Sequence, residues 1–241
     1  MIPKIIHYCW FGKNEKSKII NECIESWRKY LPDWELIEWN EDNYDVNVNM
    51  YVKGAYALKK WAYVSDYVRL DVLYKYGGIY LDVDVEFIKE LPNDLLYQKC
   101  FCGFEYTSMI APGLIWGTEK ENEFIKNILD SYENEEFVFN EKGRNKTINV
   151  RITNALEKEG LIKNNQYQKI GDIAVYPSEY FCGYNTDIGE PEITEKTICW
   201  HHYIGSWSSP TFKSRIQNLL KKILGVNNYK KLFYFIRKVR N

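Results

Sequence analysis

In the stretch 54–88 one hydrophobic period replaces another at Gly77 and Gly78, and this change restricts the folds open to the chain. Before the two glycines, apolar residues recur every three or four positions, which is the spacing of a helix face. After them, residues 79–88 alternate between apolar and polar, which is the spacing of a strand. A long helix over 54–76 that ends at a left-handed glycine and continues as a buried strand predicts an α/β unit.

The remaining sequence shows the same mixture of elements. It predicts strands at 2–8, 34–39, 101–104, 113–116, 173–176 and 197–201, and helices at 16–30, 121–132 and 149–159. Strands and helices that alternate along a chain form a sheet covered by helices. With 241 residues, the chain can bury one substantial core. We therefore expect one α/β domain over 1–210, followed by a basic amphipathic helical tail over 211–241.

The six cysteines and the apolar segments indicate the setting of the chain. Cys100 and Cys102 form a closely spaced pair, but no second pair completes a zinc site. The opening residues lack the apolar run of a signal peptide, and no segment is long and apolar enough for a bilayer span. We expect free thiols in a reducing, cytoplasmic setting.

Carboxylates gather on one side of the strand expected after the glycines. Tyr80, Asp82, Asp84 and Glu86 share a face of that strand. Like charges held this close repel one another unless a cation lies among them. Two aspartates two positions apart are usually only solvated surface acids. Here they follow a helix, a glycine turn and an apolar strand, a place where open α/β sheets bind ligands, so this position favours a hard divalent ion such as Mg²⁺ or Mn²⁺.

Four segments of the sequence carry a family resemblance. They read AYVSDYVRLDVLYKYGGIYLDVDV, IPKIIHYCWFG, IAVYPSEYF and HHYIGSW, and they fall within residues 1–210. Together they resemble glycosyltransferase family 32 and the wider group of sugar-binding DXD glycosyltransferases, which includes the clostridial glucosylating toxins. The resemblance implies a GT-A type fold, in which a Rossmann-like nucleotide-binding sheet is covered by helices. It further implies a nucleotide-sugar donor, a Mn²⁺ or Mg²⁺ cofactor and retention of the anomeric configuration.

The resemblance implies catalytic roles for four charged residues. Asp84 matches the direct metal ligand, and Asp82 matches a contact to the donor ribose or sugar, made directly or through metal-bound water. Asp66 matches a partner of the sugar hydroxyls, and Arg69 matches a contact to the sugar or diphosphate. Asp66 and Arg69 also lie three apart on one helix face, so both can reach a single ligand. A surface ion pair is the alternative for them.

Four residues from three parts of the match are assigned to binding of the donor nucleotide. Trp10 matches the residue that stacks on the base, and Tyr80, Ser206 and Trp207 are grouped with it as donor-binding residues. A single tryptophan is more often a core residue, so the role of Trp10 depends on the resemblance.

Two of the three histidines fall in the segment that completes the metal shell in such transferases. His201 and His202 are both candidates, and the family pattern favours His201. His7 lies in the first expected strand and is interpreted as structural. The chain departs from the family pattern at 109–113 and 148–150, on the acceptor side. The acceptor and the group that assists the nucleophile therefore stay open.

Charge is distributed unevenly along the chain. Residues 211–241 hold nine Lys or Arg and no Asp or Glu, which leaves 23 basic against 33 acidic residues, a balance of −10, in the rest. Apolar residues in this tail recur at helical spacing, which suits a helix lying in an anionic membrane surface. A terminal helix packed on the core is the alternative. The sequence holds no nucleic-acid recognition motif, and we expect no nucleic-acid partner.

These features predict a metal-dependent hexosyltransferase that moves a sugar from a nucleotide diphosphate donor, with UDP-sugars favoured, to a saccharide or lipid-linked oligosaccharide acceptor. We expect a role in surface or capsular polysaccharide synthesis, in the cytoplasm, with peripheral contact at the inner face of the cell membrane. Two alternatives stay open. One is a Mg²⁺-dependent nucleotidyltransferase, although the sequence lacks the triphosphate loop that such enzymes usually need. The other is a module that binds glycans or nucleotide sugars without catalysis.

Overall fold

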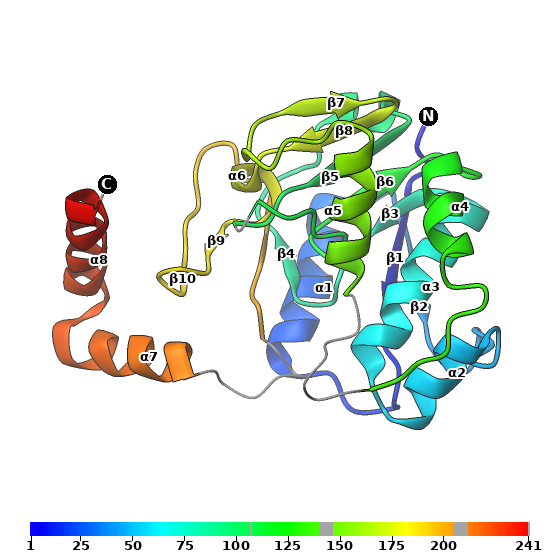
Figure 1. Cartoon of the computed structure of the whole chain (residues 1–241), viewed down its shortest axis with the longest axis horizontal. Coiled ribbons are helices and arrows are strands. Elements are labelled where there is room, and N and C mark those ends of the chain that lie inside the picture. Colours follow the sequence, from blue (N-terminus) through cyan, green and yellow to red (C-terminus); the bar gives the residue numbers. More distant parts are fainter. Residues whose placement is uncertain (107, 140–146, 205–211, 241) are drawn as a thin grey trace.

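A computed structural model describes residues 1–106, 108–139, 147–204 and 212–240 (Figure 1). Its centre is a seven-stranded sheet. In spatial order its strands are β2 (Glu35–Trp39), β1 (Ile5–Cys9), β3 (Gly78–Tyr80), β6 (Trp116–Thr118), β5 (Cys100–Gly103), β8 (Ile173–Tyr176) and β7 (Gln168–Ile170). The pairs β1/β2, β1/β3 and β5/β8 are parallel, and the pairs β3/β6, β5/β6 and β7/β8 are antiparallel.

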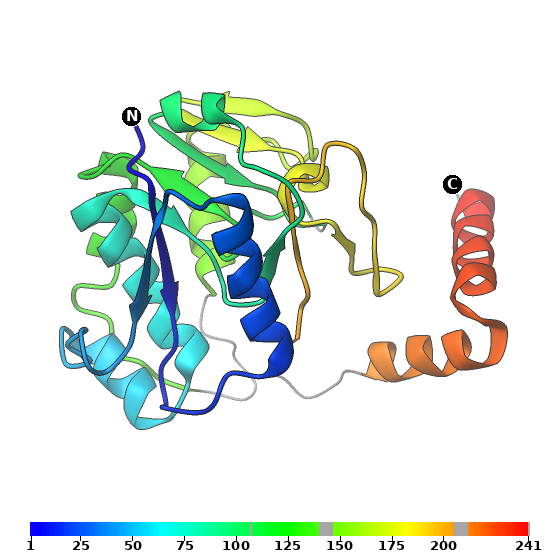
Figure 2. The same cartoon turned by 180° about the vertical axis from the view of Figure 1, so that it is seen from behind.

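Helices cover both faces of this sheet. One face is covered by α1 (Lys18–Tyr30), and the other by α2 (Met50–Ala57), α3 (Trp61–Tyr76), α4 (Glu123–Asp130) and α5 (Ile148–Lys158), as the two opposite views show (Figures 1 and 2). Each face holds its own hydrophobic cluster: Trp27 packs in one with Ile79, and Leu73 packs in the other with Trp116. The predicted α/β class, a sheet covered by helices, is confirmed.

Smaller elements flank the sheet. Strand β4 (Val85–Phe87) pairs with β11 (Cys199–His201), and β9 (Tyr184–Asn185) forms a hairpin with β10 (Glu190–Pro191). Helix α1 is fastened to β4, because the Trp27 indole donates to the Val85 carbonyl at 2.7 Å and the Phe87 amide donates to the Ser26 hydroxyl at 2.9 Å. The short helices η1 (Asn93–Tyr97) and α6 (Ser178–Phe181), together with β7, β9 and β10, are not foreseen by the sequence patterns.

The double glycine forms the turn that its position predicts. Helix α3 ends at Gly77, whose φ is 66°, and Gly78 follows with a φ of 99°. A Cβ on Gly78 would lie 2.8 Å from the Ile5 carbonyl oxygen, so the strand can approach β1 only without a side chain there. His7 Nε2 bonds to the Gly77 carbonyl at 2.8 Å, and burial lowers the pKa of His7 to about 4. The structural role expected for His7 is confirmed.

The long helix expected over 54–76 is wrong in one respect, because the structure divides it. Helix α2 starts earlier, where the Asn49 side chain accepts a hydrogen bond from the Val52 amide at 2.8 Å. It ends at Ala57, and Lys59 takes a left-handed φ of 54° before α3 begins. Leu58, which fits the helix period, is 53% exposed. The local caps therefore override the continuous period.

The continuous strand expected over 79–88 is also wrong. The chain forms β3, turns through residues 81–84, and resumes as β4, with the Val85 amide donating to the Asp82 carbonyl at 3.1 Å. Asp82, Asp84 and Glu86 consequently point to different partners instead of sharing one face. The strand expected at 113–116 is displaced to β6, and Gly113 lies in the turn that precedes it.

The C-terminal segment is helical, as predicted. Helices α7 (Phe212–Leu224) and α8 (Val226–Arg240) extend away from the sheet (Figures 1 and 2). The division into a 1–210 domain and a 211–241 tail stays a prediction. All six cysteines are buried and free. No helix among the described residues is long and apolar enough to span a membrane.

Candidate active site

A buried charge cluster joins α3 to the turn after β3. Arg69 Nη2 lies 3.2 Å from Asp66 Oδ1 and 3.3 Å from Asp82 Oδ1. The guanidinium lies 4.7 Å from the centre of the Tyr80 ring, and its Nε donates to the Ser65 carbonyl at 3.1 Å. Asp66 is 7% exposed and Arg69 4%, so the alternative of a surface ion pair is wrong. The structure brings together the residues that the sequence predicts to share a ligand.

Asp66 is the most deeply held acid of this cluster. Burial raises its pKa to about 6, and Asp82 adds to the rise while Arg69 opposes it. Asp66 Oδ2 also accepts a hydrogen bond from the Ile148 amide, at the first residue of α5, at 3.3 Å. This carboxylate therefore connects α3 to the start of α5, beside the segment on which the predicted acceptor side depends.

Asp82 is set in place by a glycine that the sequence interpretation missed. The Asp82 amide donates to the Gly113 carbonyl at 2.8 Å. A Cβ on Gly113 would lie 1.9 Å from Asp82 Oδ2 and 3.1 Å from an Arg69 guanidinium nitrogen. The sequence signal was a glycine in a stretch expected to be a strand, where glycine often marks a close approach.

Asp84 lies in the turn and bonds to the chain after β11. Its Oδ1 lies 3.1 Å from His201 Nε2, and its Oδ2 accepts from the Ile204 amide at 3.1 Å. Burial opposes the charge of Asp84, but His201 and the Ile204 amide outweigh burial and lower the pKa of Asp84. For His201, burial is likewise outweighed by Asp84, and the pKa of His201 is raised.

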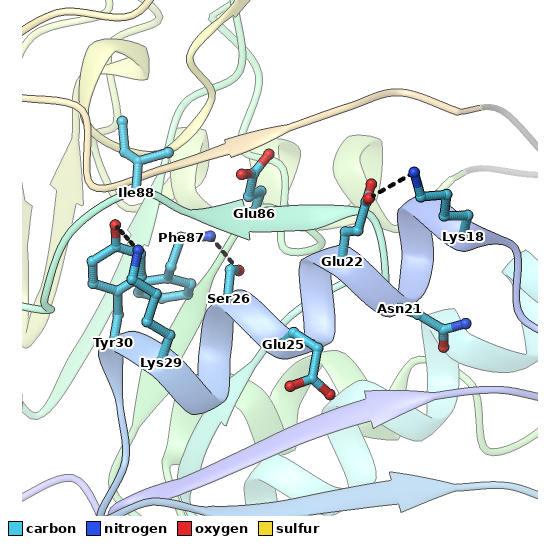
Figure 3. A pocket seen from close by; sticks show the side chains of 10 residues that line it. All are labelled: Lys18, Asn21, Glu22, Glu25, Ser26, Lys29, Tyr30, Glu86, Phe87 and Ile88. Atoms are coloured by element: carbon cyan, nitrogen blue, oxygen red, sulfur yellow. Dashed lines mark hydrogen bonds and ion pairs between the residues drawn. The ribbon is translucent and has the colours of Figure 1, made fainter.

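The two neighbouring histidines face different carboxylates. His202 Nε2 lies 2.7 Å from Glu86 Oε2, and its ring centre lies 3.7 Å from that of Trp200. The structure therefore places His201, the residue favoured by the family pattern, at Asp84, and it places His202 with Glu86. Glu86 also lines a groove of about 480 Å³ between α1 and β4, to which Glu22 and Asn21 contribute from α1 (Figure 3).

The donor atoms of Asp84 and His201 fit a hard divalent cation in part. Neighbouring ligand atoms of an octahedral Mg²⁺ lie roughly 3 Å apart, close to the 3.1 Å between Asp84 Oδ1 and His201 Nε2. His201 Nδ1, however, accepts from the Tyr203 amide at 3.0 Å, so the neutral ring carries its proton on Nε2. His201 can bind a metal through Nε2 only after that proton moves. Within the described ranges, no group of three or more His, Cys, Asp or Glu side chains forms a ready-made metal site.

The remaining predicted residues have separate positions. Trp10 follows β1 and is half-buried, with its indole donating to the Asn14 carbonyl at 2.7 Å and Lys16 Nζ 5.4 Å from the ring centre. Tyr80 is 1% exposed and lies beneath Arg69, so it supports the cluster from below. Ser206 and Trp207 lie outside the described residues.

Known proteins are similar to part of this chain. Inositol phosphoceramide mannosyltransferase 3 of Schizosaccharomyces pombe is 34% identical over 95 residues, covering 35% of this chain and 24% of that protein. Inositol phosphoceramide mannosyltransferase 1 of the same organism is 30% identical over 109 residues, covering 41% and 32%. The chain thus aligns with about a quarter to a third of the length of these relatives.

Two of the solved structures that align with this chain are glycosyltransferases. The PaToxG glycosyltransferase aligns with a TM-score of 0.48 at 22% identity, covering 66% of this chain and 69% of its own. The galactosyltransferase LgtC, in complex with donor and acceptor sugar analogs, aligns with a TM-score of 0.44 at 11% identity, covering 95% and 94%.

The family comparison falls on the segment that holds the charge cluster. Residues 17–102 match the family described as "Glycosyltransferase sugar-binding region containing DXD motif". This range contains Asp66 and Arg69 on α3 and the two aspartates of the turn. The predicted resemblance is confirmed: residues 17–102, which include Asp82 and Asp84, are similar to the sugar-binding region of the DXD glycosyltransferases.

Proposed function

We propose that this chain is a retaining glycosyltransferase that uses Mn²⁺ or Mg²⁺ and takes its sugar from a nucleotide diphosphate donor. The observation that carries the proposal is the Asp66–Arg69–Asp82 cluster, which lies inside the matched sugar-binding region next to the Asp84–His201 pair, of which Asp84 also falls in that region. A bound cation would be held by Asp84, with His201 after its proton has moved. It would supply positive charge for the departing diphosphate.

The exposure of the side chains divides the remaining roles. The Asp82 side chain is 31% exposed, whereas those of Asp66 and Arg69 are 10% and 5% exposed. Asp82 is therefore the carboxylate that faces a ligand, and it accepts hydrogen bonds from ribose or sugar hydroxyls. Arg69 holds the Asp82 carboxylate in position, and it adds positive potential where the leaving phosphates gather. Attack by the acceptor hydroxyl from the face of the leaving group gives retention.

The finer assignments concern the donor, the acceptor and the setting. The sequence favours a UDP-sugar, and the names of the two yeast relatives add mannose as a candidate sugar. Those names also include a lipid, which supports a lipid-linked acceptor alongside a free saccharide. We propose a role in surface or capsular polysaccharide synthesis in the cytoplasm.

A panel of nucleotide sugars tests the proposal. The purified chain is incubated with UDP- and GDP-sugars and Mn²⁺, and released nucleoside diphosphate is measured. The expected result is release from one donor, lost with a chelator and lost in Asp84→Asn. Asp172→Asn, which changes an exposed aspartate paired with Lys99, is the matched control and should keep full activity.

The same assay separates the two alternatives. Binding of a nucleotide sugar without turnover, with or without acceptor saccharides, would identify a binding module. Release of pyrophosphate from a nucleoside triphosphate and a sugar phosphate would identify a nucleotidyltransferase. Either result contradicts the proposed transfer.

A further inference from the structure

The two C-terminal helices form an angled unit that is anchored to the body at the β9–β10 hairpin (Figures 1 and 2). The Gln217 side chain donates to the Asp187 carbonyl at 2.5 Å, and Lys221 Nζ donates to the Gly189 carbonyl at 2.6 Å. Lys221 also pairs with Glu190 at 2.7 Å, and its side chain is only 11% exposed. The anchor is therefore polar, specific and largely buried.

These contacts occupy one side of the unit. Gln217 and Lys221 lie four apart, so they share one side of α7. Lys221 Nζ also lies 5.7 Å from the centre of the Tyr229 ring of α8, and Tyr229 is 6% exposed. The chain passes from α7 to α8 through Gly225, whose φ is 76°. Lys221 thus connects both helices to the hairpin.

Large apolar side chains of both helices are exposed. Ile216, Leu219 and Ile223 recur at three and four positions, and they are 42%, 57% and 68% exposed. On α8, Leu232 is 42% exposed and Phe235 is 66% exposed. Large apolar side chains that gather at helical spacing and stay exposed mark an interaction surface. We name Ile216, Leu219, Ile223, Leu232 and Phe235 the outer face.

The charges around the outer face identify its partner. Lys222 and Lys231 are exposed beside it, and residues 211–241 hold nine basic and no acidic residues. A helix with an apolar face, a basic polar face and no acid is suited to the interface of an anionic bilayer, where both kinds of residue gain energy. We propose that the outer face of α7 and α8 docks this protein on an anionic lipid surface.

This surface is separate from the charge cluster of the candidate active site. The outer face lies on α7 and α8, which extend away from the sheet, whereas the charge cluster lies on α3 and the turn after β3 (Figures 1 and 2). Lipid binding can consequently be present or absent whatever the outcome of the donor assay. Since attraction and apolar burial act together, binding should weaken as salt rises without disappearing.

Vesicle flotation of the full chain tests the proposal. We expect the chain to float with vesicles of mixed phosphatidylglycerol and phosphatidylcholine and to stay behind with phosphatidylcholine alone. The double variant Lys222→Gln/Lys231→Gln should bind anionic vesicles about thirtyfold more weakly, because each lysine near an anionic surface strengthens binding by about five- to sixfold. Leu219→Gln/Ile223→Gln should lose most of the binding.

Matched variants on the body serve as controls. Lys169→Gln removes an exposed lysine from β7, and Ile162→Gln removes an apolar side chain that is 63% exposed. Both should bind vesicles like the original chain. Three results overturn the proposal: no binding to anionic vesicles, equal binding to neutral vesicles, or binding unchanged in the outer-face variants. A dimer in solution that Leu219→Gln/Ile223→Gln dissociates, without lipid binding, would assign the outer face to a second copy instead.

Discussion

Gly113 and Asp82 are in such close contact that only the absence of a side chain on one allows the carboxylate of the other. An added Cβ at Gly113 would lie 1.9 Å from Asp82 Oδ2 and 2.6 Å from its Cγ. The Gly113 carbonyl meanwhile holds the Asp82 amide at 2.8 Å. The backbone of one segment thus forms the wall against which Asp82, the carboxylate that we propose faces the donor, is set.

Gly113→Ala should displace the Asp82 carboxylate from Arg69. We expect donor turnover to fall by about tenfold to a hundredfold, with a loss of about 1–3 kcal/mol in unfolding free energy from overpacking. Steady-state kinetics and thermal unfolding measure the two effects. Gly171→Ala is the control, since Gly171 has a φ of 54° and no described atom within 4 Å of its added Cβ. It should cost stability without changing turnover, and equal loss of turnover in both variants would contradict the role of Gly113.

Asp66 should make stability depend on pH below neutrality. Its pKa is raised to about 6 by burial, so the folded state keeps a proton that the unfolded state releases near 3.8. Between those values the folded state binds more protons, and the contribution of Asp66 to unfolding free energy falls as pH rises. The fall amounts to about 3 kcal/mol at most.

Denaturant unfolding of Asp66→Asn between pH 4 and 6 measures this effect. The variant should lack the downward slope that the original chain shows. Asp33→Asn, a change at an exposed turn aspartate, is the control and should keep that slope. Parallel pH profiles in all three proteins would show that Asp66 titrates normally.

Asp84 should matter for the fold as well as for the cation. The sequence alone suggests that Asp84→Ala relieves repulsion among crowded acids, but the structure gives this carboxylate His201 and the Ile204 amide as partners. We therefore expect Asp84→Ala to lose about 1–3 kcal/mol of unfolding free energy without metal. Asp84→Asn, which keeps an acceptor for the Ile204 amide, should lose less. Metal-free melting curves that rank the two variants in the opposite order would contradict this account.

Trp10→Ala should weaken the binding of a nucleoside diphosphate by about 1–3 kcal/mol, the range for loss of a base–aromatic stack. Titration calorimetry on the folded variant measures the change. Trp34→Ala changes another partly buried tryptophan on the same hydrophobic cluster, and it is the control. If both variants bind the nucleotide like the original chain, Trp10 belongs to the core alone.

The α/β architecture follows from periodicity because its main segments obey one period each. Helix α3 packs several apolar residues against the sheet and ends at a glycine pair, so both its face and its end are encoded locally. The meeting of Asp66 with Arg69 follows from helical spacing, and their burial follows from the apolar residues around them.

The features that the sequence patterns miss depend on contacts between distant segments. The left-handed Lys59 and the turn at 81–84 interrupt apparently continuous periods. A glycine is needed at position 113 because the Asp82 carboxylate leaves no room for a side chain there, and no local sequence pattern indicates this contact. His201 and His202 are neighbours in sequence, and only the pairing of β11 with β4 decides that they face Asp84 and Glu86 respectively.

In the proposed function, Asp84 recruits a divalent cation that the donor diphosphate needs. Calorimetry of UDP and GDP binding to the full chain, with Mn²⁺ and after chelation, tests it most directly, with Asp84→Asn measured in parallel. We predict at least tenfold tighter binding with Mn²⁺ for the original chain and no gain from Mn²⁺ for the variant. Affinity for the nucleotide that is the same with and without the cation in the original chain would contradict the claim.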